Sequence, residues 1–298
     1  MPNTIVIGSD GSAQADAALQ FGGTLARALG ARVVVVSAYV HSPPLRGDAG
    51  SFEAVMREEA EELARQGAAS IEGVSDVKAV ASYGATIADA LHRAAQAQGA
   101  DLLVVSTSGR RRIAGHQLGS ISERVAHESP CPVAVVPPRD SQPRFTSIGV
   151  AVDGTPAARA ALDFAFRLGR RAGAEAPTFR LLHVTPAPQH VPQPGSTYPA
   201  GRQLDSEQLE DMAAETAAYG EVEVLQRIGD PADELVRMSE GLDVLVIGAR
   251  YQGAVKRLLL GSVSTHVVRN ATCPVIVVPP LPAGSLAGET AKAEPTSA

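Results

Sequence analysis

The sequence predicts an α/β protein with two tandem, doubly wound domains, each built on a five-stranded parallel sheet of Rossmann-like type. Short apolar runs alternate with longer amphipathic stretches over the 298 residues, which is the pattern of strand–helix–strand crossovers. Hydrophobic residues make up 45% of the chain, yet aromatic residues only 4%. Cores of Ala, Val, Leu and Ile are typical of parallel sheets that helices cover on both faces.

The two domains are predicted because the chain repeats itself. SPCPVAVVPP at 129–138 matches ATCPVIVVPP at 271–280, and ADLLVVS at 100–106 matches LDVLVIG at 242–248. The offset is 142 residues in both cases. A period of this length is too long for a solenoid and indicates a tandem duplication. We expect a first domain at 1–138, a linker at 139–145, a second domain at 146–280 and a disordered tail at 281–298.

The elements of the first half follow from local signals. The apolar run after residue 3 predicts a strand, and Ser12 and Gly30 have the residue types that begin and end a helix. A Val-rich run predicts the second strand, and a stretch with its charges on one face predicts an amphipathic helix. We expect strands at 4–9, 31–39, 77–83, 101–106 and 132–137, and helices at 12–30, 52–71, 86–99 and 120–129.

The second half repeats this order. We expect its strands near 147–152, 178–184, 221–228, 242–247 and 274–278. Its long segment at 185–203 is rich in Pro and polar residues, as is the segment in the same place of the first half. Both are predicted to be loops near the end of a strand.

Composition and charge exclude several classes of protein. The net charge of −6 argues against a nucleic-acid-binding surface, and two cysteines are too few for a disulfide framework or a zinc set. The N-terminal segment lacks the basic region and long apolar stretch of a secretory signal, and no apolar run is long enough to span a membrane. We therefore expect a cytoplasmic protein that binds neither membranes nor nucleic acid.

An Asp–Gly–hydroxyl turn follows the first strand of each half. The turn is GSDGS at 8–12, with Asp10, and it returns in VAVDGT at 150–155, with Asp153. In open parallel sheets, ligands bind beyond the carboxyl ends of the strands, where the strand order reverses. Each Asp is placed to accept a hydrogen bond from a ligand hydroxyl or amine. The alternative is a tight turn that feeds a helix N-cap.

A glycine- and hydroxyl-rich segment follows the fourth strand of each half. It reads STSGRRRIAGHQLGSIS at 106–122 and GARYQGAVKRLLLGSVS at 248–264. Glycine allows close approach to an anion, and helix N-terminal amides supply oriented donors. The segments add basic side chains, so together they have the parts of a polyphosphate site. Those side chains are Arg110, Arg111, Arg112, Lys256 and Arg257.

These motifs resemble the universal stress protein family. Its nucleotide loop is Gly, two residues, Gly, nine residues, Gly, then Ser or Thr. The first half departs from this pattern at Ser106 and the second half at Tyr251. The resemblance covers nearly the whole chain except the linker and tail, and it implies a fold of the adenine nucleotide alpha hydrolase-like type. It also implies that the last strands of the two halves pair within one chain as a pseudo-dimer, with a homodimer of chains as the alternative.

The resemblance implies ATP as the ligand, with another adenine nucleotide as the alternative and Mg²⁺ as a companion of ATP. It implies a first-half site at Gly8, Asp10, Ala38, Val105, Ser106, Gly109, Gly119, Ser120, Ile121 and Ser122. The implied second-half site comprises Asp153, Val184, Ile247, Gly248, Gly261, Ser262, Val263 and Ser264. We expect the second site to be weaker, because Tyr251 places a large side chain where backbone approach is needed.

The other candidates have structural interpretations. We expect His127 at a helix end and His183 at the end of a strand near the base site, either packed or in contact with ligand. Cys131 and Cys273 are expected to be buried and inert. The sequence offers no catalytic residue and no metal-ligand set, so the leading function is nucleotide-dependent regulation without catalysis. An interaction scaffold with degenerate sites and a slow ATPase are the alternatives.

Overall fold

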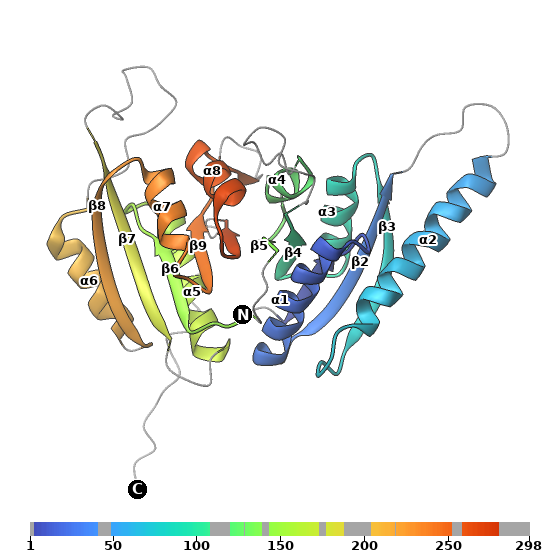
Figure 1. Ribbon diagram of the computed structural model, residues 1–298, viewed down its shortest axis with the longest axis horizontal. Helices are drawn as coiled ribbons and strands as arrows, with labels where there is room; N and C mark the ends of the chain where they lie inside the picture. The colour runs from blue at the N-terminus through green and yellow to red at the C-terminus, as the bar shows by residue number, and fades with distance from the viewer. Residues whose placement is uncertain are drawn as a thin grey trace, which may run out of the picture.

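A computed structural model of the chain contains the predicted alternation of strands and helices in both halves (Figure 1). It describes residues 3–40, 49–107, 120–127, 129–138, 143–172, 177–187, 204–217, 219–251 and 258–279. The expected tail at 281–298 and most of the expected linker and of both long loops lie outside these residues.

The elements of the first half lie close to their predicted ranges. They are β1 (Thr4–Gly8), α1 (Ala13–Leu29), β2 (Arg32–Val40), α2 (Ala49–Ala69), β3 (Val77–Gly84), α3 (Ile87–Ala97), β4 (Leu102–Ser106), α4 (Ser120–Ala126) and β5 (Val133–Val136). The last helix is shorter than expected and ends at Ala126. Pro130 disfavours helical backbone at the residue before it, which limits how far this helix can extend.

The second half has the same order with one addition. Its elements are β6 (Ser147–Ala151), α5 (Pro156–Ala172), β7 (Thr178–Pro186), α6 (Ser206–Ala217), β8 (Glu221–Gly229), α7 (Pro231–Ser239), β9 (Val244–Gly248), β10 (Arg250–Tyr251), β11 (Leu258–Leu259), α8 (Ser262–Asn270) and β12 (Val275–Val278). The ribbon of β10 and β11 is antiparallel and was not predicted.

All ten main strands form one sheet in the order β3-β2-β1-β4-β5-β12-β9-β6-β7-β8. Within each half the neighbouring strands are parallel. The halves meet where β5 and β12 pair antiparallel, with Ala134 opposite Ile276. The expected pairing of the last strands within one chain is therefore present, and it places the two halves about a pseudo-two-fold axis.

The residues at the two ends of α1 show how the local sequence determines where this helix begins and ends. Ser12 is its N-cap, and the Ser12 hydroxyl oxygen accepts a hydrogen bond from the backbone N–H of Ala15 at 3.3 Å. Gly30 ends the helix in the left-handed region, with φ of 65°, which a residue without a β-carbon adopts readily. Both predicted signals are confirmed, and they set the path of the turn between β1 and α1.

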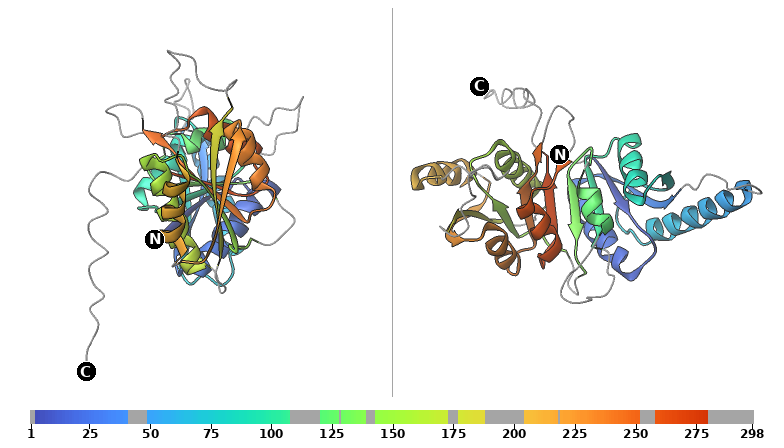
Figure 2. Two further views of the ribbon diagram at one scale, coloured as in Figure 1. Left: turned by 90° about the vertical axis from the view of Figure 1, so that its left-hand side faces the viewer. Right: turned by 90° about the horizontal axis from the view of Figure 1, so that it is seen from above.

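Helices cover both faces of the sheet, so the fold is doubly wound (Figures 1 and 2). One apolar cluster joins strand residues to α1, α2, α5 and α6, and it includes Ile5, Phe21 and Phe179. The other joins the opposite strand faces to α3, α4, α7 and α8. The cores are mainly Val, Leu, Ile and Ala, as the composition predicts.

Candidate functional site

The fold places the two Asp turns where the strand order reverses. In the first half, β1 lies between β2 and β4, and in the second half β6 lies between β7 and β9. The chain leaves β1 toward β2 and later returns on the other side as β4, and the second half does the same. These positions are topological switch points, at which open α/β sheets bind ligands. Asp10 and Asp153 lie just beyond the carboxyl ends of β1 and β6.

The turn at Asp10 is built by its own side chain. The Asp10 Oδ1 atom accepts the backbone N–H of Ser12 at 3.1 Å and the Ser12 hydroxyl at 2.5 Å. Gly11 supplies the left-handed backbone, with φ of 72°. The structural interpretation of this motif is therefore confirmed. The Asp10 side chain is also exposed, so its carboxylate is accessible at the strand edge.

The second turn repeats this geometry. The Asp153 Oδ1 atom accepts the backbone N–H of Thr155 at 3.0 Å and the Thr155 hydroxyl at 2.5 Å, and Gly154 has φ of 71°. The Thr155 hydroxyl oxygen in turn accepts the backbone N–H of Ala158 at 3.2 Å, which caps α5. The duplicated motif has thus kept both its sequence and its hydrogen bonds.

The strands beside the turns extend further and supply the expected main-chain positions. The last residue of β1 pairs with Val36, so Ala38 lies two residues beyond the end of β1. Val184 lies two residues beyond Leu182, which pairs with the end of β6. Ala38 and Val184 are half-buried. The backbone of each of these neighbouring strands therefore continues alongside the Asp turn.

The two halves differ at the residue that precedes each of these main-chain positions. The position before Ala38 is Ser37, whereas the position before Val184 is His183, and both side chains are buried. The His183 Nδ1 atom lies 3.0 Å from the carbonyl oxygen of Val152, so Nδ1 carries the proton in this contact. The Nε2 atom is buried and has no hydrogen-bond partner among the described residues. His183 therefore ties β7 to the turn that carries Asp153.

The fourth strands place Val105 with Ser106 and Ile247 with Gly248 at the same edge of the sheet. Val105 and Ile247 are buried, while Ser106 and Gly248 are half-buried. A β-carbon at position 248 would lie 2.5 Å from the backbone carbon and oxygen of Ala157. The glycine is thus required by the close approach of α5, whether or not a ligand binds.

The first glycine of the site also has a packing role. Gly8 ends β1, and a β-carbon there would lie 3.2 Å from Leu91 and 3.3 Å from Val105. These contacts are tighter than ordinary van der Waals packing. Gly8 therefore allows α3 and β4 to pack closely at the switch point of the first half.

The start of α8 is the best described part of the expected phosphate region. Gly261 is its N-cap and has no side chain to satisfy the first amides, and a β-carbon there would meet nothing within 4 Å in the described part of the chain. The Ser262 side chain is exposed, and those of Val263 and Ser264 are half-buried. The first turn of α8 thus presents backbone donors and two hydroxyl groups at the strand edge.

The equivalent region of the first half is only partly described. Gly109, Gly119 and the arginine run lie outside the described residues, and only the backbone of Ser120 is described. Ile121 is exposed, whereas Ser122 is buried. The roles expected for these glycines therefore stay predictions.

Tyr251 lies in the antiparallel ribbon, where its backbone pairs with Leu258. The side chain of Tyr251 and residues 252–257 are outside the described part, so its expected effect on the second site stays a prediction. The apolar run that contains Leu258 was the sequence signal for β11. It was missed because two-residue strands lie below the length at which periodicity indicates a strand.

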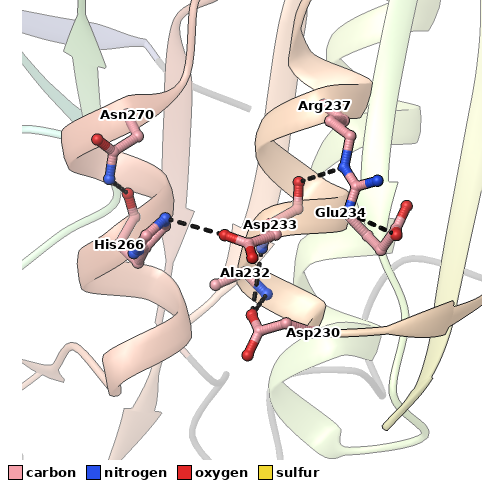
Figure 3. A network of polar contacts seen from close by, with 7 residues as sticks. All are labelled: Asp230, Ala232, Asp233, Glu234, Arg237, His266 and Asn270. Carbon is pink, nitrogen blue, oxygen red and sulfur yellow. Dashed lines mark hydrogen bonds and ion pairs between the residues drawn. The ribbon is translucent and has the colours of Figure 1, made fainter. Parts of the chain in front are cut away.

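Polar contacts hold α8 from both sides. Toward α7, the His266 Nε2 atom lies 3.5 Å from the Asp233 carboxylate, and Asp230 caps α7 by accepting the backbone N–H groups of Ala232 and Asp233 (Figure 3). Toward the first half, the Arg269 guanidinium donates to the Glu123 carboxylate at 2.6 and 3.0 Å. Sequence reasoning missed this last pair, because residues so distant in the chain give no local signal.

The remaining candidates behave as structural residues. Cys131 and Cys273 are both buried as expected, and burial raises the pKa of the Cys131 thiol to about 12, which favours its protonated form. Within the described ranges, no group of three or more His, Cys, Asp or Glu side chains is arranged to hold a metal ion. A search of the same ranges finds no helix with the length and apolar character needed to cross a membrane.

Comparison with known proteins decides the family. A model of the universal stress protein family matches residues 1–137 and again 144–279. The chain belongs to the universal stress protein family. The two matches correspond to the two halves of the ten-stranded sheet, so this universal stress protein contains the family's unit twice.

Relatives of known sequence and structure agree with this assignment. A universal stress protein of Mycolicibacterium smegmatis is 29% identical over 294 residues, which cover 93% of this chain and 97% of the relative. Universal stress protein Rv2005c of Mycobacterium tuberculosis is 32% identical over 184 residues, 60% of this chain and 61% of that protein. A crystal structure of a universal stress protein from Archaeoglobus fulgidus shares the fold, with a TM-score of 0.73 at 22% identity over 93% of this chain and 98% of that one.

Proposed function

We propose that this universal stress protein binds an adenine nucleotide, ATP in the first place, and acts as a regulator in the stress response. The observation that carries the proposal is the duplicated Asp turn. Asp10 and Asp153 lie at the two switch points of the sheet with the same hydrogen bonds, each beside a strand that leads into a glycine- and serine-containing segment. Duplication explains why the turn occurs twice, so the support for ligand binding is that both copies have kept the carboxylate and its hydrogen bonds at a switch point.

The donor set suits a nucleotide. A carboxylate at Asp10 or Asp153 can accept a hydrogen bond from a ribose hydroxyl or a base amine. The main chain near Ala38 or Val184 can form hydrogen bonds with the edge of the base. The uncapped first turn of α8 and its serine hydroxyls are matched to phosphate oxygens. A cyclic adenine nucleotide would use the same groups. Mg²⁺ would accompany ATP through the phosphate oxygens, and the chain's own residues would bind and orient the ligand.

We propose regulation without catalysis. Asp10 and Asp153 belong to the base and ribose end of the proposed site, away from a terminal phosphate. The ligand would therefore act by changing the stability or surface of the protein, in the cytoplasm, as a single chain or as a homodimer. A slow ATPase is distinguished by phosphate release that scales with protein concentration and is lost on replacement of Gly119.

A second function is favoured by one observation in the second half. The ribbon of β10 and β11 occupies the segment in which the family motif has its second glycine, at Tyr251. Backbone pairing at Tyr251 differs from the glycine turn that the family motif has at this position. This supports an interaction scaffold in which the second site has lost its nucleotide.

The decisive experiment identifies the ligand directly. The purified chain is denatured, the released small molecules are identified and counted by mass spectrometry, and ATP binding to ligand-free protein is measured by calorimetry. Two adenine nucleotides per chain would support both sites, and one would support a single competent site. Absence of released nucleotide together with absence of ATP binding would refute the proposal and favour the scaffold.

A pair of substitutions separates the turn from the ligand. In Asp10→Asn, the side-chain oxygen still accepts the Ser12 donors, but the carboxylate is lost. Hydrogen bonds to charged groups contribute about 1.5–3 kcal/mol, so we expect ATP affinity at the first-half site to fall by about 10- to 100-fold. The melting temperature should stay near that of the unmodified chain. Asp10→Ala should lower both quantities, and equal ATP affinity in Asp10→Asn and the unmodified chain would contradict the proposed role.

A further inference from the structure

The helix α8 is held in place by residues of the other half. Its first turn is the part of the second-half site that the structure describes best, so the inference rests on the proposed nucleotide binding. Figures 1 and 2 show α4 and α8 side by side at the centre of the molecule. The position of α8 is therefore set partly by the first half of the chain.

The last turn of α8 is fixed by an ion pair. The Nε and Nη2 atoms of Arg269 donate to the same Glu123 oxygen at 3.0 and 2.6 Å. The Glu123 side chain is 21% exposed and that of Arg269 is 39% exposed, so water shields the pair only in part. By comparison, the contact of α8 with its own half through His266 and Asp233 is longer, at 3.5 Å, and more exposed.

The segment that leads into α8 is held by a second contact with the first half, made by the residue that directly follows α4. The backbone N–H of Leu260, which directly precedes the N-cap Gly261, donates to the Nδ1 atom of His127 at 3.4 Å. Glu123 and His127 are four residues apart and joined by a backbone hydrogen bond of 2.9 Å, so they share one helical face. One surface of the first half thus holds both ends of α8.

We propose that Glu123 and His127 are positioning residues for the nucleotide site of the second half. A nine-residue helix moves as a rigid unit, so a displacement of its last turn also displaces the amides of its first turn. Phosphate recognition depends on the direction of those amides. The second-half site is therefore completed by the first half, and its affinity depends on residues that do not touch the ligand.

The experiment uses the full chain with Asp10→Asn, which is expected to weaken the first-half site by about 10- to 100-fold. ATP binding is followed by calorimetry, and the second-half site is fitted separately from the weakened first-half site. Loss of an ion pair with this degree of exposure is expected to change the affinity for ATP by about two- to five-fold. Glu123→Gln should weaken ATP binding by this factor. Glu62→Gln removes the same charge from the Glu62–Arg65 pair inside α2 and should leave the affinity unchanged.

Two further variants separate positioning from general destabilisation. If the pair acts as a unit, Glu123→Gln combined with Arg269→Gln should bind ATP no more weakly than either single variant. Arg269→Lys keeps the charge and should retain most of the affinity. Both measurements remain informative if one variant folds poorly.

The outcomes are distinguishable. ATP binding in Glu123→Gln and Arg269→Gln that equals that of the Asp10→Asn chain would overturn the inference while the proposed function stands. Equal weakening in Glu123→Gln and Glu62→Gln would also overturn it, because the effect would then be one of net charge. Failure of the unmodified chain to bind ATP would refute the proposed function, and the inference with it.

Discussion

Replacement of Gly248 by alanine tests whether a glycine of the family's loop motif serves packing in this chain. A β-carbon at position 248 would lie 2.5 Å from the carbon and oxygen of the Ala157 backbone and 2.9 Å from its side chain. The clash is with the first turn of α5, which cannot swing aside as a flexible side chain can. The helix must therefore shift away from β9, or the strand must bend.

Overpacking of this kind costs about 1–3 kcal/mol. For a domain of this size, a loss of about 2 kcal/mol lowers the melting temperature by about 4–8 °C. We expect this fall for Gly248→Ala, measured by circular dichroism or calorimetry without added nucleotide. Ser106 holds the equivalent position of the first half and already carries a β-carbon, so Ser106→Ala is the matched control and should change little.

A melting temperature for Gly248→Ala equal to that of Ser106→Ala would refute the packing argument. The motif glycine would then have to be explained by ligand approach alone. If the melting temperature falls as expected in the absence of nucleotide, packing explains the glycine at position 248. Its presence then says little about whether the second half binds a ligand. The evidence for a second site would then rest on Asp153 and the start of α8.

Three other perturbations follow from the structure. Burial raises the pKa of Cys131 from 9.0 to about 12, so the native thiol at pH 8 should be alkylated about a thousand-fold more slowly than in denaturant. Because the pKa of the thiol is higher in the folded than in the unfolded protein, the protonated thiol contributes to stability below pH 9, and this contribution is lost as the pH rises toward 12. The free energy of unfolding should therefore fall less steeply with pH in Cys131→Ala than in the unmodified chain. Ser12→Ala removes the cap on Ala15 and should cost about 1 kcal/mol in urea unfolding, and an unchanged midpoint would contradict the cap. Asp243 accepts hydrogen bonds from the backbone N–H groups of Thr146 and Ser147 at 2.9 and 3.0 Å, so Asp243→Ala should cost about 2 kcal/mol by the same assay.

The fold was predictable because its signals are local and repeated. Ser12 and Gly30 mark the ends of α1, and the buried strands read as continuous apolar runs. The same signals occur twice, and the second half was predicted to repeat the element order of the first. The order of the strands within the sheet was not predicted, because the crossover rules of parallel sheets leave several arrangements open.

The candidate site was predictable only in part. Asp10 and Asp153 were found because a turn motif at a strand end is a short-range pattern. The ribbon at Tyr251 was not found, because its strands are two residues long and the sequence between them contains no Asn-Gly or Asp-Gly pair. The packing role of Gly248 was also missed, since contact with Ala157 arises only when α5 folds back over β9.

The contacts between the halves explain why a duplicated chain gains from staying fused. Glu123 and Thr265 are equivalent positions in the repeat, as are His127 and Arg269. A dimer of two first halves would place Glu123 opposite His127 twice, and a dimer of two second halves would place Thr265 opposite Arg269 twice. The Glu123–Arg269 pair forms only when unlike halves meet. Covalent linkage lets the two sides of this interface differ in sequence, and the Glu123–Arg269 pair then adds a contact that only unlike halves can make.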